Sequence, residues 1–104
     1  MTAVVHMVMW RLDGATVQAR RTQAQGLVAA FAALRGKMPG LLRLEVGTNL
    51  IDTADACDVA LYTVFDSPQA LDAYNAHPEH LKIKAMMAPW RAARCQDDFE
   101  LESL

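Results

Sequence analysis

Residues 65–80 read FDSPQALDAYNAHPEH, and this stretch contains two helix starts separated by one break. The hydroxyl group of Ser67 can cap a helix, and Pro68 suits the first helical position, so a helix is predicted to begin here. His77 precedes a proline, and that position disfavours helical backbone. Pro78 can then open a second helix, as Pro68 does, which ends before the next proline. The stretch therefore predicts the end of a strand followed by a helix in two pieces.

The rest of the chain predicts four strands and one longer helix. Residues 41–49 alternate apolar and polar side chains, which is typical of a half-buried strand, and apolar residues recur at helical spacing between 15 and 37. The expected strands cover residues 4–12, 41–49, 58–65 and 92–101. The order β-α-β-β-α-β in a single domain of residues 1–104 predicts an α+β, ferredoxin-like fold. This fold has a four-stranded antiparallel sheet with helices on one face.

Such a fold leaves the second face of the sheet uncovered. The side chains that alternate outward along two neighbouring strands are apolar, and we expect this face to bury itself against a second copy of the chain. The residues expected on the open face are Val5, Met7, Met9, Leu61, Thr63 and Phe65. The sequence therefore predicts a homodimer.

Composition excludes several functional classes. Hydrophobic residues make up 53% of the chain and charged residues 21%, which is typical of a globular protein rather than a disordered one. The net charge is −2 and no basic run exceeds two residues, so we expect no nucleic-acid partner. The chain shows neither a signal peptide nor an apolar run long enough to span a bilayer, so we expect a cytoplasmic protein with no membrane partner. In that compartment Cys57 and Cys95 are expected to be free thiols.

Two of the three histidines, His77 and His80, lie within six residues of Tyr74. Histidine exchanges protons near neutral pH, so this grouping indicates proton chemistry. His80 is expected in the first turn of a helix, where the helix dipole disfavours the imidazolium form, and a neutral imidazole suits a general base. The alternative interpretation is that His80 belongs to a helix cap and Tyr74 to the core.

His6 alternates with Val4, Val8 and Trp10 along the first strand and so faces an apolar side. It is either a buried core histidine or a second polar anchor in a cavity shared with His80. The spacing of His77 and His80 across a proline does not match a metal-ligand motif, and we expect no metal and no cofactor.

The chain resembles the stress-responsive A/B barrel (Dabb) domain family over almost its whole length. The resemblance rests on short pieces in a fixed order: Val5-His6-Met7-Val8, Pro39-Gly40, Leu44-Glu45-Val46-Gly47-Thr48-Asn49, Asp58-Val59-Ala60-Leu61, Phe65-Asp66-Ser67, Ala70-Leu71 with Tyr74, His77-Pro78-Glu79-His80 and Asp97-Asp98-Phe99-Glu100. It implies ferredoxin-like protomers that pair into a dimeric α+β barrel.

The site is similar to that of a plant polyketide cyclase of the family, which needs no cofactor. The resemblance implies that His80 and Tyr74 are catalytic, with His80 as the base and Tyr74 as the donor to an enolate oxygen. The first-strand histidine of that cyclase matches His6. A further pocket histidine of the cyclase has no counterpart here, and Asp58 stands near its place.

We expect an apolar pocket for a small hydrophobic or carbonyl-containing ligand. Its ligand-binding residues are expected to be His6, His77, Trp10 and Phe31. Three functions remain open. The first is cofactor-free proton abstraction that leads to aldol-type cyclisation or isomerisation of a carbonyl compound. The second is a non-enzymatic stress-associated or ligand-binding dimer, and the third is a cofactor-free oxygenase.

Overall fold

A computed structural model describes residues 2–102 and confirms the predicted order of elements. One 3₁₀ turn, Ala88–Trp90, links the last helix to the last strand. The strands are β1 (Val4–Leu12), β2 (Leu41–Thr48), β3 (Val59–Phe65) and β4 (Arg91–Glu100), and the helices are α1 (Val17–Ala32), α2 (Pro68–Ala76) and α3 (Pro78–Met87).

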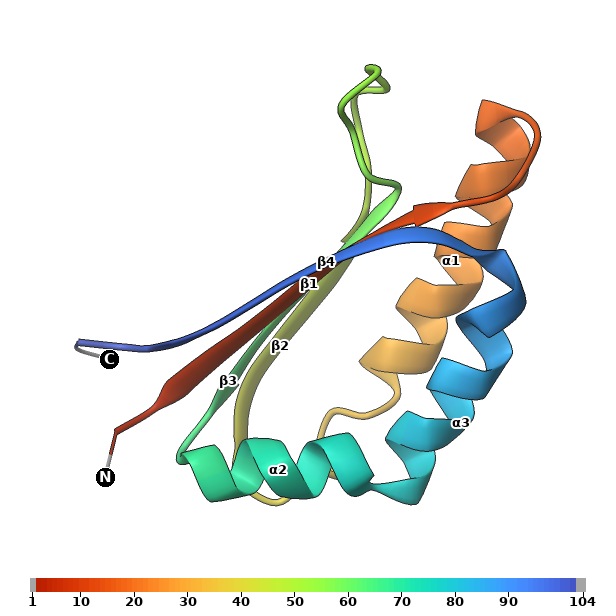
Figure 1. Cartoon of the computed structure of the whole chain (residues 1–104). Helices are drawn as coiled ribbons and strands as arrows, with labels where there is room; N and C mark the ends of the chain where they lie inside the picture. The colour runs from red at the N-terminus through yellow and green to blue at the C-terminus, as the bar shows by residue number, and fades with distance from the viewer. Residues whose placement is uncertain (1, 103–104) are drawn as a thin grey trace.

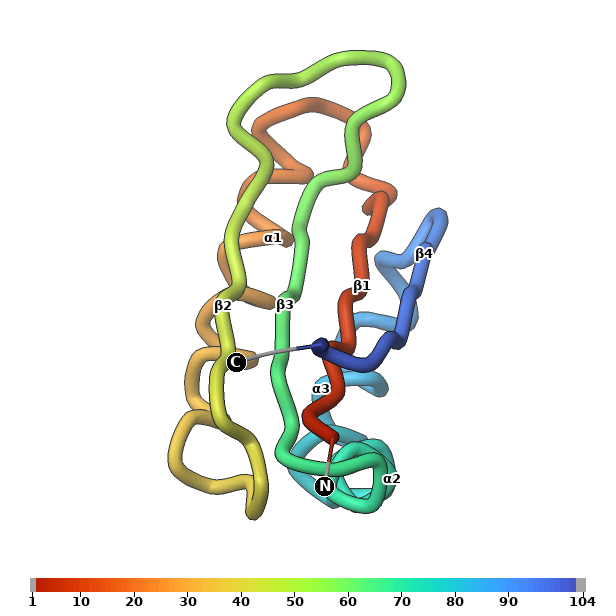
Figure 2. Tube along the Cα trace, turned by 90° about the vertical axis from the view of Figure 1, so that its left-hand side faces the viewer, coloured from red at the N-terminus to blue at the C-terminus, as the bar shows by residue number. Residues whose placement is uncertain are grey.

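The four strands form one sheet in the order β2-β3-β1-β4, and every neighbouring pair is antiparallel. Figure 1 shows all three helices on one side of this sheet, with the other side open. This arrangement is the predicted ferredoxin-like fold. Figure 2 shows β4 as an edge strand beside β1, with α3 behind the two strands.

Side-chain caps start all three helices at the positions where the chain turns. Thr16 Oγ1 accepts a hydrogen bond from the backbone N–H of Ala19 at 3.0 Å, and Ser67 Oγ accepts one from that of Ala70 at 3.1 Å. His77 has extended backbone, and its Nδ1 accepts a hydrogen bond from the Glu79 N–H at 3.1 Å. The break at this histidine, predicted from the proline that follows it, is confirmed.

The first helix ends five residues earlier than its apolar spacing indicates, at Ala32. Turns then lead to Gly40, whose φ of 80° is a left-handed conformation that favours glycine. A Cβ atom there would lie 2.5 Å from the Cβ of Ala70 and 2.8 Å from Asp66 Oδ1. The glycine therefore lets the loop before β2 pack closely against the start of α2.

The main core fills the space between the sheet and the helices. Trp10 of β1 stacks on Phe31 of α1, with ring centroids 5.4 Å apart and an interplanar angle of 22°. Further buried members of this core are Val8, Leu12, Ala24, Leu27, Leu44, Leu61, Phe65, Ile83 and Met87. Apolar packing of this kind supplies most of the stability of a small domain.

The open face of the sheet differs from the prediction along β3. Val5 pairs with Val64, and Met7 pairs with Tyr62. Residues directly opposite each other in an antiparallel pair share a face, so β3 presents Ala60, Tyr62 and Val64 to the open side. Leu61, Thr63 and Phe65, which we expected there, face the helices and are at most 1% exposed. The β1 part of the prediction was correct and the β3 part was wrong by one residue of register.

A bulge changes the expected alternation at the start of β2. The pairing with β3 shifts between Leu41 and Arg43, so Leu42 is extra to the ladder. Leu42 is 54% exposed, whereas its neighbour Leu41 packs against the main core. Strict alternation with the buried Leu44 would turn Leu42 toward the helices, and the inserted residue of the bulge turns it outward instead.

The structure also bears on the expected state of the cysteines and on the expected absence of a membrane span. Cys57 and Cys95 are free thiols. Within residues 2–102, none of the helices combines the length and apolar character that crossing a membrane requires.

Candidate functional site

A cavity of about 570 Å³ lies where α3 faces β1 and the edge strand β4. Its floor is apolar and its outer wall is polar, because β4 places alternate polar side chains opposite the inward residues of β1. The lining residues are His6, Val8, Trp10, Phe31, Leu61, Asn75, His80, Lys84, Ala85, Met87, Ala88, Arg91, Arg94 and Gln96. The volume is suitable for a small organic molecule.

His80 forms one wall of the cavity from the first turn of α3, and it is 8% exposed. Its Nδ1 lies 3.3 Å from the carbonyl oxygen of Asn75. A carbonyl oxygen only accepts hydrogen bonds, so Nδ1 carries the proton and Nε2 of the neutral ring keeps its lone pair. Burial lowers the pKa of His80, and the positive charges of Lys84 and Arg94 lower it further. The hydrogen bond to Asn75 raises this pKa, but its effect is smaller than that of burial. His80 is therefore a neutral base at neutral pH.

Tyr74 of α2 packs between the two cavity histidines. Its ring centroid lies 4.3 Å from that of His80 and 6.0 Å from that of His6. The residue is 1% exposed, and among residues 2–102 its hydroxyl oxygen finds no hydrogen-bond partner. Burial raises the pKa of Tyr74, which keeps the hydroxyl protonated. Tyr74 is not among the residues that line the cavity, so its ring packs behind His80 with an unused hydrogen-bond donor on it.

His6 reaches the cavity from β1 and is 3% exposed. Its Nδ1 lies 2.5 Å from Asp98 Oδ1, and the carboxylate accepts the bond. Gln96 Nε2 donates to the other carboxylate oxygen of Asp98 at 2.8 Å. Two side chains of β4 therefore fix the orientation of the imidazole.

Gln96 and Asp98 were not predicted as site residues, although Asp98 lies in the Asp97-Asp98-Phe99-Glu100 piece of the family resemblance. The signal that could have found them is their position in β4. Asp98 pairs with His6 across the ladder, and Gln96 pairs with Val8, so both point toward the helices. Polar residues at positions that normally face a core indicate a cavity there.

The other expected site residues divide between the cavity and the helix cap. Trp10 and Phe31 form part of the cavity floor as a stacked pair. His77 does not line the cavity; its ring caps α3 and is half-buried. We therefore assign His77 to the start of the helix.

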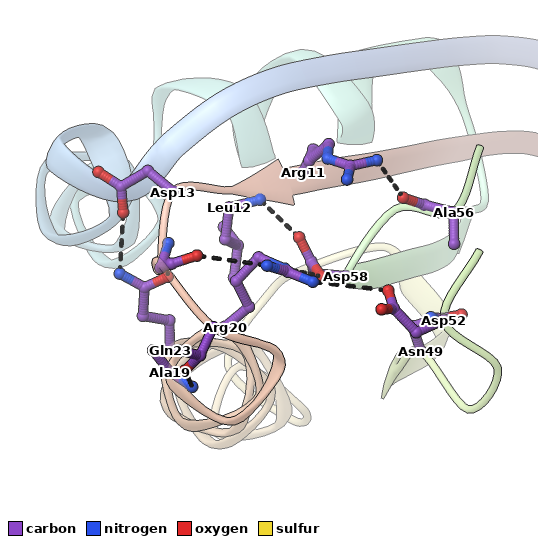
Figure 3. A network of polar contacts seen from close by, with 12 residues as sticks. Arg11, Leu12, Asp13, Ala19, Arg20, Gln23, Asn49, Asp52, Ala56 and Asp58 are labelled. Carbon is purple, nitrogen blue, oxygen red and sulfur yellow. Dashed lines mark hydrogen bonds and ion pairs between the residues drawn. The ribbon is translucent and has the colours of Figure 1, made fainter. Parts of the chain in front are cut away.

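Asp58 does not line the cavity and belongs to a separate polar network (Figure 3). It accepts hydrogen bonds from the Leu12 N–H at 2.7 Å and from Arg20 Nε at 3.1 Å. Arg20 also lies 3.5 Å from Asp52. These contacts tie the loop between β2 and β3 to α1, which is a structural role. Across residues 2–102, no three histidine, cysteine or acidic side chains are placed to hold a metal ion together.

Comparisons with known proteins agree with this fold. A family model described as "Stress responsive A/B Barrel Domain" matches residues 4–101. No curated protein matches the chain.

The chain is also similar to solved structures. One is a dimeric protein of unknown function with a ferredoxin-like fold from Bacteroides fragilis NCTC 9343. It is 26% identical, with a TM-score of 0.83 over 95% of this chain and 96% of that one. A dimeric ferredoxin-like protein of unknown function from Thermobifida fusca YX is 25% identical, with a TM-score of 0.81 over 96% and 92% of the two chains. A hydroxynitrile lyase from Passiflora edulis shares the fold at 20% identity, with a TM-score of 0.75 over 98% and 96%.

Proposed function

Because the chain belongs to the stress-responsive A/B barrel domain family, we propose that its cavity binds a small carbonyl compound and removes a proton beside the carbonyl group. The observation that carries the proposal is the pairing of a neutral base with an unused donor. His80 lines the cavity, its Nε2 is left unprotonated by the contact of Nδ1 with Asn75, and the ring of the buried Tyr74 packs against the imidazole.

The reaction needs two roles from the protein. His80 Nε2 takes the proton from the carbon next to the carbonyl, and the electron pair of the broken C–H bond moves onto the carbonyl oxygen as an enolate. Tyr74 donates its hydroxyl hydrogen bond to that oxygen as negative charge develops. The enolate then attacks a second carbonyl of the same molecule in an aldol cyclisation, or it is reprotonated at another carbon in an isomerisation. The proton on His80 returns to the product.

Three features support this chemistry. Burial and neighbouring cations keep His80 neutral, and burial keeps Tyr74 protonated, so each group is in the state that its role requires. His6, held by Asp98, supplies a second polar group that can orient the substrate. A protein described as a hydroxynitrile lyase has the same fold, so the fold can carry small-molecule catalysis.

Exchange of hydrogen for deuterium tests the proposal. A panel of 1,3-diketones is incubated with the protein in D₂O, and loss of the signal from the carbon-bound proton is followed by NMR. The wild type should accelerate exchange, His80→Gln should return it to the buffer rate, and Tyr74→Phe should slow it roughly 10- to 1000-fold. His77→Asn is the matched control, because asparagine also caps a helix and the residue lies outside the cavity. Wild-type exchange at the buffer rate across the panel would count against the proposal.

The second candidate is a ligand-binding protein without catalysis. The stacked Trp10 and Phe31 with the other apolar residues of the floor would bind an apolar molecule whether or not His80 acts as a base. Ligand binding by both the wild type and His80→Gln, with no proton exchange by either, is the result that favours this function.

We also propose that the protein works as a homodimer. The structures from B. fragilis and T. fusca are described as dimeric. The open face of the sheet here carries Met7, Met9 and Tyr62, with Met9 40% exposed. An apolar sheet face is commonly covered by a second protomer.

A further inference from the structure

The charges that line the cavity have one sign. Lys84 of α3 and Arg91 and Arg94 of β4 all contribute to the lining, and no aspartate or glutamate does; Asp98, the carboxylate beside the cavity, is hydrogen-bonded to His6 and Gln96. This contrasts with the whole chain, which has a net charge of −2. The cavity is therefore a basic region on a slightly acidic protein, and its field attracts anions.

Within residues 2–102, none of these three side chains forms an ion pair. Lys82 gives the contrast, because it lies on the same helix, outside the cavity lining, and pairs with Glu79 at 3.3 Å. The side chains of Lys84, Arg91 and Arg94 are exposed and lie on the solvent side of the cavity, above an apolar floor.

The sheet register explains how Arg94 of β4 faces the cavity. Arg94 pairs with Trp10, and Trp10 points toward the helices as part of the core. Residues that are directly opposite in an antiparallel pair share a face, so Arg94 points inward at a position where a core would use an apolar residue. Beside burial, the charges of Lys84 and Arg94 also lower the pKa of His80, which lines the same cavity.

We propose that the ligand of this cavity carries an anionic group, a carboxylate or a phosphate, attached to an apolar and preferably aromatic body. The anion binds Lys84, Arg91 and Arg94, while the body lies on Trp10 and Phe31. The inference deepens the proposed function, and rests on it only for the statement that a carbonyl of the same ligand reaches His80. The same cations would stabilise the negative charge of an enolate.

Matched probes test the charge requirement separately from catalysis. Calorimetric titrations at low salt compare 2-naphthoate with 2-naphthamide, which has the same body without the charge, and with 2-naphthyl phosphate. We expect the better of the two anions to bind at least about 10-fold more tightly than the amide, since a hydrogen bond to a charged group typically contributes this much. The better anion identifies whether the site selects carboxylate or phosphate. The preference should shrink as salt rises from 20 to 500 mM.

Variants test whether Lys84, Arg91 and Arg94 cause the preference for the anion over the amide. Lys84→Gln/Arg94→Gln should bring the anion to within about 3-fold of the amide, whereas Lys82→Gln should keep the wild-type ratio. Circular dichroism checks that each variant is folded, and Arg91→Gln/Arg94→Gln replaces the first pair if that pair is unstable.

Three results would overturn the inference: equal affinity for acid and amide, a preference that survives both double variants, or no binding of any probe. None of these probes has an exchangeable proton beside a ketone, so their binding says nothing about the base. Failure of the deuterium-exchange test therefore leaves the anion preference standing, and the reverse is also true.

Discussion

Replacing Tyr74 by phenylalanine should stabilise the ligand-free protein and weaken catalysis at the same time. The hydroxyl is buried, with the residue 1% exposed, and it has no hydrogen-bond partner among residues 2–102. A buried polar group without a partner costs about 1–3 kcal/mol, and Tyr74→Phe removes that cost. The oxygen also makes a few van der Waals contacts, each worth roughly 0.1–0.2 kcal/mol, which the variant loses. The net gain in unfolding free energy is therefore about 1–2 kcal/mol.

Urea denaturation and thermal melts measure this gain. For a domain of this size, each kcal/mol raises Tm by roughly 4–8 °C. Both proteins are compared at one concentration, because the stability of a dimer depends on it. Lys82→Gln is the control, since the exposed Lys82 lies outside both the cavity and the open face, and it should change stability by less than about 1 kcal/mol.

The sign of the change decides between two interpretations of the phenol. A core aromatic whose hydroxyl is satisfied would lose stability when the hydroxyl is removed, by about 1 kcal/mol. A loss of that size in Tyr74→Phe would refute the view that the hydroxyl is held unpaired for a ligand. A gain in stability together with slower proton exchange would show that the group serves function at the expense of the fold.

Three further perturbations follow from the same structure. Burial lowers the pKa of His80, so the unfolded state binds more protons below its own pKa of about 6.5, and folding should weaken as pH falls through that value. Stability–pH curves should be flatter in this range for His80→Gln; an unchanged slope contradicts the assignment. Light scattering at micromolar concentration should give twice the chain mass for the wild type and a lower mass for Met7→Glu, and a monomeric wild type excludes the dimer. Asp58→Asn should cost roughly 2–3 kcal/mol, because it removes the buried carboxylate charge that pairs with the largely buried Arg20 and leaves it only the more exposed Asp52. In contrast, the exposed Asp52→Asn should cost under about 1 kcal/mol by the same denaturation assay.

Much of the fold follows from local signals in the sequence. The hydroxyl groups of Thr16 and Ser67 and the ring of His77 satisfy backbone N–H groups within three residues of themselves, so a helix start is visible without knowledge of the rest of the chain. The break at His77 depends only on the proline that follows it. The order of strands and helices then leaves few topologies for a chain of this length.

The candidate site was predicted only in part. The grouping of Tyr74 and His80 was readable because both lie on one short stretch of chain, on either side of a helix break. His6 could be placed on an inward face of its strand by alternation, but its partner could not. Asp98 is separated from it by 92 residues, and only the pairing of β1 with β4 brings the two together.

By itself, the sequence determined the order of the elements and the residues that start the second and third helices, since these depend on neighbours along the chain. The tertiary structure alone decided which faces β3 and the start of β2 present. Register across the sheet turned Thr63 inward, and a bulge turned Leu42 outward. It also brought Lys84 of α3 and Arg94 of β4 into one cavity. The physical reason is that a strand has two equivalent faces, and pairing with another strand selects between them.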